Sequence, residues 1–200
     1  TTRNFAPAKY LLLMITFTGF FAFPSIVLMP AMARGVLGGT SRTLGLLLMG
    51  VAIGALIASL LMASRKTPQG LAKICSATCI AFGIAQAVFS LSPSINIAIA
   101  LAAPIGFTMV SCTIACNSLL QLMAPPESRS RVMSLYTLAI MGIPTFGSLS
   151  AGKLGDLLGT NWALFIFGVF CAAFAYYFKR KLDHLEFTIT KTLIIRGVLE

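Results

Sequence analysis

Five long runs without any Lys, Arg, Asp or Glu constrain this chain more than any other feature of its sequence. The runs contain 24, 22, 53, 21 and 22 residues and are Tyr10–Ala33, Thr43–Ser64, Ile74–Pro126, Val132–Gly152 and Leu157–Phe178. A helix needs roughly 20 apolar residues to cross a bilayer, so four of these runs each fit one span. Only 10% of the residues are charged, against about 25% in a soluble domain, and a lipid bilayer is therefore the expected surrounding.

The longest run, Ile74–Pro126, fits two helices joined by a turn. Its middle contains the Ser/Pro/Asn cluster Ser90–Asn96, which is typical of a turn. We therefore predict an all-α membrane protein with six transmembrane helices. The predicted division is a cytoplasmic lead-in (1–9), a six-helix domain (10–178) and a basic cytoplasmic tail (179–200), with spans at about 10–33, 43–64, 74–91, 96–121, 132–155 and 160–178.

The distribution of Lys and Arg predicts the orientation in the membrane. With six spans, 12 of the 15 basic residues fall on the side of the two termini, and only Arg34, Arg42 and Lys153 fall on the other. Basic loops stay in the cytoplasm, so both termini are expected there, in a multi-pass plasma membrane protein, with a bacterial inner membrane as the expected site. The same bias accounts for the net charge of +10 without nucleic acid as a partner.

The few charges near the spans have two interpretations each. Glu127, Arg129 and Arg131 lie in a predicted cytoplasmic turn between the fourth and fifth helices. They are either topological anchors or part of a cytoplasmic gate. Lys153 and Asp156 flank the outer end of the fifth helix, as an interfacial pair or as part of an external gate.

Small residues recur at helical spacing in two of the predicted spans. Gly50 and Gly54 are four residues apart in the second span, and Gly147, Ala151 and Gly155 continue the same spacing in the fifth. This spacing lets membrane helices approach closely, so these residues are predicted to pack against neighbouring helices. The prolines in or beside the spans are either hinges or simply common membrane-helix residues: Pro24, Pro30, Pro104 and Pro144.

Uncharged polar residues inside the spans are candidates for a substrate path. They are Gln86 in the third helix and, at intervals of four on one face of the fourth, Thr113, Asn117 and Gln121. Polar groups within a membrane default to a functional hypothesis. The alternative for the fourth helix is ordinary helix–helix hydrogen bonding.

Neither an enzyme site nor a cofactor site is expected. The chain has one histidine, His184, no paired carboxylates within the spans and no nucleotide-binding loop. Two cysteine pairs, Cys75/Cys79 and Cys112/Cys116, have a spacing of four that could suit a metal. A structural zinc ion usually takes four ligands, and a free cysteine behaves as a small hydrophobe, so buried apolar cysteines without a metal are the favoured interpretation.

The stretch from Asn117 to Gly168 resembles the major facilitator superfamily, and most closely its branch with the enterobactin exporter and related efflux proteins. The similar motifs are Asn117–Gln121, Arg129–Ser134, Gly147–Gly159 and the nearby Trp162. The loop Ser64–Lys73 keeps the basic residues of the family's pattern but lacks its Asp. The resemblance implies the C-terminal half of a twelve-helix bundle, whose N-terminal six-helix half is encoded in the same or a separate chain. In many members of the family that other half carries the charges that couple transport to protons.

Two classes of function follow from these observations. The first is a secondary active transporter, an exporter of a small amphipathic substrate such as a siderophore or drug, which works by rocking two halves around a midplane site. The second is a non-transporting membrane protein, either a half-size protein or a remnant. A half-transporter that forms a homodimer lies between the two.

Overall fold

The computed structural model describes residues 6–65, 67, 69–124 and 129–195. Its regular structure in this part of the chain is entirely helical. The elements are α1 (Ala6–Ala22), α2 (Pro24–Val27), α3 (Met29–Ala31), η2 (Met32–Val36), α4 (Ser41–Ala63), α5 (Leu71–Ser90), α6 (Ile95–Met123), α7 (Arg129–Thr137), η4 (Leu138–Gly142), α8 (Ile143–Leu158) and α9 (Thr160–Ile195).

These elements form six helical stretches that are long and apolar enough to cross a membrane. They are Lys9–Val36, Ser41–Ala63, Leu71–Ser90, Ile95–Met123, Arg129–Leu158 and Thr160–Arg180. The predicted fold class, an all-α protein with six transmembrane helices, is confirmed. The last helix, α9, continues to Ile195, beyond the predicted end of the span at residue 178.

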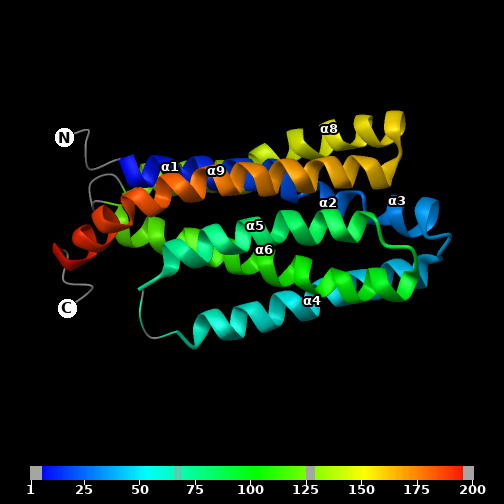
Figure 1. Cartoon of the computed structure of the whole chain (residues 1–200), viewed down its shortest axis with the longest axis horizontal. Coiled ribbons are helices and arrows are strands. Elements are labelled where there is room, and N and C mark those ends of the chain that lie inside the picture. The colour runs from blue at the N-terminus through cyan, green and yellow to red at the C-terminus, as the bar shows by residue number, and fades with distance from the viewer. Residues whose placement is uncertain (1–5, 66, 68, 125–128, 196–200) are drawn as a thin grey trace.

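The six stretches form an elongated bundle (Figure 1). The beginning of α1 and the end of α9 lie at the same end of the bundle, as an even number of spans requires. The turns from α5 to α6 and from α8 to α9 lie at the opposite end. Gly159 makes the second of these turns with a φ of +92°, a conformation that glycine adopts at little cost.

Glycines allow three pairs of helices to approach closely. A Cβ atom at Gly54 of α4 would overlap the backbone of Ala103 in α6, and one at Gly83 of α5 would overlap the backbone of Ala172 in α9. A Cβ atom at Gly147 of α8 would overlap the backbone of Phe20 in α1. These pairs are packed through their backbones, as small residues in membrane helices permit.

The predicted small residues of the fifth span do not share one environment. Gly147 and Ala151 are buried, but a Cβ atom at Gly155 would lie 3.9 Å from its nearest neighbour, Thr160 Cα. In the second span, Gly50 and Gly54 both face α6, because a Cβ atom at Gly50 would lie 2.9 Å from the carbonyl oxygen of Ile99. Close packing therefore ends before Gly155.

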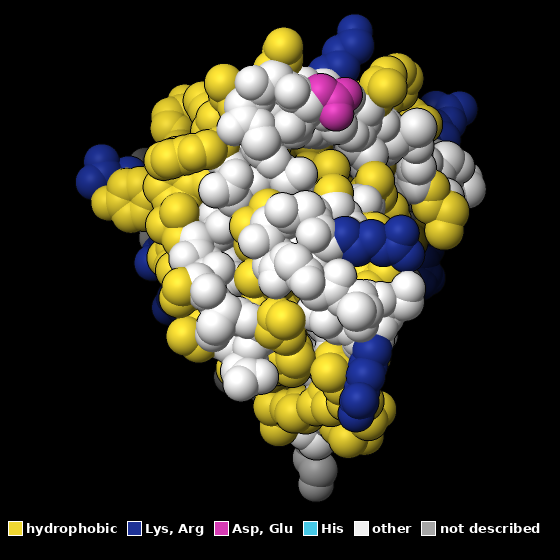
Figure 2. All heavy atoms as spheres, turned by 90° about the vertical axis from the view of Figure 1, so that its right-hand side faces the viewer, with side chains coloured by type: hydrophobic (Ala, Val, Ile, Leu, Met, Phe, Trp, Pro, Cys, Tyr) yellow, Lys and Arg dark blue, Asp and Glu magenta, His cyan; other side chains and the backbone are white. Residues whose placement is uncertain are grey.

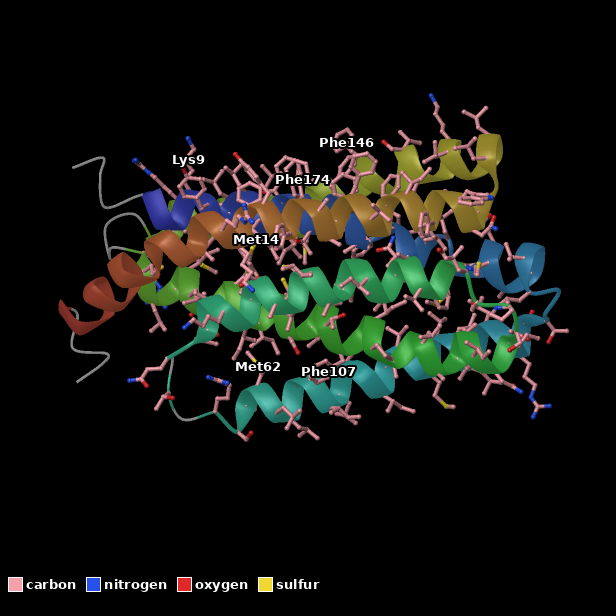
Figure 3. The ribbon with its side chains drawn as sticks, in the orientation of Figure 1. Lys9, Met14, Met62, Phe107, Phe146 and Phe174 are labelled. Atoms are coloured by element: carbon pink, nitrogen blue, oxygen red, sulfur yellow. The ribbon has the colours of Figure 1, made fainter. Side chains whose placement is uncertain are left out.

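Large apolar side chains cover the outside of the bundle, especially on α4 and α8. Examples are Leu60 at 62% exposure, Phe146 at 64% and Leu157 at 80%. Figure 3 shows Phe146 pointing away from the bundle. Figure 2 views the end that carries the α5–α6 and α8–α9 turns, where apolar side chains are interspersed with basic ones and an acidic one. The apolar outer faces of α4 and α8 are suited to lipid or to another helical domain.

Candidate functional site

A cavity of about 240 Å³ lies between α1, α6, η4 and α8. Most of its lining is apolar, and its polar side chains are those of Thr18 and Thr113. A mostly apolar pocket with few polar groups is typical of a site for a small molecule. The lining residues are Ile15, Thr18, Gly19, Ala22, Phe23, Met109, Val110, Thr113, Ile114, Ile140 and Pro144.

The first span is interrupted beside this cavity. Helix α1 ends at Ala22, Phe23 follows, and Pro24 begins the four-residue helix α2. Proline has no N–H to donate and its ring displaces the carbonyl four residues earlier, so a proline inside a helix kinks or breaks it. Phe23, which lines the cavity, therefore lies at the break between α1 and α2.

The fifth span is irregular at the same cavity. The π-helical turn η4 covers Leu138–Gly142, and Pro144 follows near the start of α8. The wider turn accommodates the carbonyl of Ile140, which a proline four residues later cannot bond. Such π turns inside α-helices frequently occur at functional sites. Ile140 and Pro144 both line the cavity, so irregular backbone borders it on two sides.

The predicted polar row on α6 leads from this cavity toward the end of the helix. The Thr113 hydroxyl donates to the carbonyl of Met109 at 2.9 Å, and Tyr136 of α7 donates its hydroxyl to the carbonyl of Thr113 at 3.2 Å. The amide of Gln121 donates to Asn117 Oδ1, and Arg129 donates to Gln121 Oε1 at 3.3 Å. Arg129, on the next helix, is thus linked by hydrogen bonds to two members of the row.

Gln86 lies apart from this row. It is fully buried on α5, and its Nε2 donates to the carbonyl of Leu164 in α9 at 3.4 Å. Its Oε1 has no hydrogen-bond partner among the described residues. Gln86 does not line the cavity, so the structure places it at the α5–α9 contact.

The predicted gate charges lie at the surface where they are described. Arg129 and Arg131 are exposed at the start of α7, and Lys153 and Asp156 are exposed on α8. No ion pair joins Lys153 to Asp156 in the described part of the chain. Glu127, and with it any contact to Arg131, lies outside the described residues.

The structure also brings together the four cysteines of the two pairs, for which buried apolar cysteines without a metal are the favoured interpretation of the sequence. Cys75 and Cys79 of α5 face Cys112 and Cys116 of α6, and each of the four is at most 1% exposed. The Sγ atoms of Cys75, Cys112 and Cys116 all lie within 4.8 Å of one another. The Sγ atoms of Cys79 and Cys112 are 2.7 Å apart.

Sequence reasoning missed most of the cavity lining. Thr18, Phe23 and Ile140 lie in apolar stretches that carry no distinguishing motif. The available signal was the pair of prolines, Pro24 and Pro144, which mark the two helix irregularities beside the cavity.

A family model that matches nearly the whole chain identifies its family. Residues 2–190 match the family model described as transmembrane secretion effector. The chain therefore belongs to this family of the major facilitator superfamily. A search of curated proteins found no match.

A solved structure shares the fold. It is a bacterial homolog of the human lysosomal transporter Spinster, in an inward-facing and unoccupied conformation, with a TM-score of 0.64 and 19% identity. The match covers 86% of this chain and 42% of the other. The chain thus spans less than half the length of that protein and corresponds to one half of a transporter fold.

Proposed function

We propose that this chain is the C-terminal half of a secondary active transporter that exports a small amphipathic molecule, such as a siderophore or a drug. The observation that carries the proposal is the cavity of about 240 Å³ between α1, α6, η4 and α8. Its lining suits the apolar part of such a substrate, and Thr18 and Thr113 supply hydroxyl groups for its polar part.

The irregular segments beside the cavity support movement during transport. In transporters, broken helices typically form the substrate site, around which the two halves rock or gate. Phe23 precedes the break in the first span, and Ile140 lies within the π turn of the fifth. A change at either segment alters the cavity wall directly.

An N-terminal six-helix half completes the proposed site, in the same or a separate chain. The six predicted spans of this chain contain no Asp or Glu, so proton coupling would depend on carboxylates of the other half. The apolar outer faces of α4 and α8 offer surfaces for that half and for lipid. Arg129 and Arg131 would take part in a gate at the cytoplasmic end, and Lys153 and Asp156 at the outer end.

Thr113 provides the sharpest test of the cavity. Thr113→Val keeps the shape of the side chain but removes its hydroxyl. We expect transport of a substrate that bonds this hydroxyl to fall several-fold, because one hydrogen bond contributes about 0.5–1.5 kcal/mol. Thr16→Val is the matched control: the Thr16 hydroxyl also bonds the carbonyl four residues earlier, that of Leu12, but Thr16 does not line the cavity.

The assay uses the 200-residue chain co-reconstituted with an N-terminal six-helix half, with ethidium and a catecholate siderophore as probes. Equal transport by both variants would exclude Thr113 from the substrate site. The chain reconstituted alone is expected to move neither probe, because alternating access needs two facing halves. Transport by the chain alone would favour a homodimer, and no transport under any condition would favour the non-transporting alternative.

A further inference from the structure

We propose that Cys75, Cys112 and Cys116 form a binding site for a soft monovalent metal ion, Cu(I) or Ag(I), inside the helical bundle. The site is separate from the cavity, and none of its residues lines that cavity. The proposal does not depend on transport, because it rests on the packing of α5 against α6.

The geometry of the three sulfur atoms suits one metal ion. Their Sγ atoms lie within 4.8 Å of one another. Metal–sulfur bonds of about 2.3 Å place two sulfurs roughly 4.0 Å apart around a three-coordinate ion and roughly 4.6 Å apart across a two-coordinate one. An ion can therefore be held by side-chain adjustment, without movement of the helices.

Two helices supply these ligands in register. Cys112 and Cys116 are one turn apart on α6 and present both sulfurs to α5. Cys75 completes the set from α5, and its thiol donates to the carbonyl of Cys112 at 3.9 Å. The cluster lies near the end of the bundle where α5 begins and α6 ends. The path of an ion to the cluster is therefore shorter from this end of the bundle than from the opposite end.

The ligand set favours Cu(I) or Ag(I) over zinc. Sulfur ligands select soft ions, whereas a structural zinc ion takes four tetrahedral ligands, with sulfurs roughly 3.8 Å apart. The Sγ atom of the fourth cysteine, Cys79, is only 2.7 Å from the Sγ atom of Cys112. The same Cys79 sulfur accepts a hydrogen bond from the Thr18 hydroxyl at 3.4 Å. Cys79 does not belong to the set of sulfurs that all lie within 4.8 Å of one another, so a fourth sulfur ligand for a tetrahedral site is not in place.

Burial restricts the charge of the complex. The three thiols are at most 1% exposed and belong to an apolar cluster that includes Met14, Leu119 and Val132; Figure 3 shows Met14 in the interior of the bundle. An unpaired charge in such surroundings is costly. A monovalent ion that replaces the proton of one thiol gives an uncharged metal–thiolate and releases one proton, while the other two thiols stay protonated and contribute only weak sulfur contacts to the ion.

The test is a Cu(I) titration of the purified 200-residue chain in detergent, without oxygen and in competition with a chromogenic Cu(I) chelator. We expect one Cu(I) per chain. Cys112→Ala and Cys116→Ala should each weaken binding by more than about tenfold, since even changes beside metal ligands weaken binding by that much. Cys171→Ala is the matched control, because Cys171 is also buried, at 2% exposure, but belongs to α9 and lies outside the three-sulfur set.

X-ray absorption of the Cu(I)-loaded wild-type chain keeps the test independent of the folding of the variants. It should show two or three sulfur neighbours near 2.3 Å and no oxygen or nitrogen neighbours. The proposal is overturned by oxygen or nitrogen neighbours, or by equal affinity in the Cys112, Cys116 and Cys171 variants. Thiol trapping that reveals a Cys79–Cys112 disulfide in freshly isolated protein would also overturn it, because Cys112 would then have no free sulfur to donate.

Discussion

Two glutamines show how much the setting of one residue depends on packing. Gln86 and Gln121 both lie in the same charge-free stretch of sequence. Gln86 is fully buried against the carbonyl of Leu164, whereas Gln121 is exposed and accepts a hydrogen bond from Arg129. The first residue serves the contact of two helices, and the second extends a polar row from the cavity.

Arg129 is the residue through which that row meets α7. We predict that Arg129→Gln lowers transport per inserted molecule but leaves the topology unchanged, since 11 of the 12 basic residues on that predicted side remain. An exposed polar contact contributes about 0–1 kcal/mol, enough to shift two conformers that differ by a few kcal/mol.

The matched control is Arg131→Gln, which removes the same charge two residues away but leaves the bond to Gln121. Transport and protease accessibility of the two variants, measured in the co-reconstituted protein, separate the specific bond of Arg129 to Gln121 from the charge that Arg129 and Arg131 both bring to the proposed gate. If the two variants behave alike, the specific bond from Arg129 has no part in transport.

At the scale of the element, the contact of α8 with α1 depends on Gly147. Gly147→Ala places a Cβ atom where the carbonyl oxygen of Phe20 lies, and the helices must separate. We expect a loss of about 1–3 kcal/mol in the free energy of unfolding, as for other overpacked cores. Gly155→Ala is the control, because its nearest neighbour would be 3.9 Å away. Unfolding of both variants in detergent measures the difference, and equal stability would show that α8 moves away from α1 freely.

The π turn before Pro144 is a second property of an element. Pro144→Ala restores a backbone donor, so a regular α-helix becomes accessible through residues 138–144. We predict unchanged insertion but slower transport, because the wall of the cavity at Ile140 is displaced. Pro104→Ala is the control, since Pro104 lies in the continuous helix α6 and does not line the cavity. Unaltered transport in Pro144→Ala would show that the irregular turn is not needed for movement.

The six-span topology is a property of the whole molecule, and labelling from one face of the membrane tests it. Six spans place the α5–α6 turn and the start of α7 on opposite faces of the membrane. Ser94→Cys and Ser130→Cys are suitable probes because both positions are exposed, and the five native cysteines are at most 2% exposed. A membrane-impermeant thiol reagent applied to intact cells should label Ser94→Cys only. Labelling of both positions from one face would contradict the six-span arrangement.

The sequence by itself determined the number of helices and the class of the protein, because crossing a bilayer is a matter of length and polarity along the chain. The charge-free runs specify six spans whatever their neighbours are, and the motifs from Asn117 to Gly159 carry the family likeness. Tertiary structure alone decided which faces meet. It places Gly147 against α1 and leaves Gly155 open, joins Arg129 to Gln121, and brings three cysteine sulfurs within 4.8 Å of one another. Spacing along a helix specifies which residues share a face, but only the packing of one helix on another specifies what that face contacts.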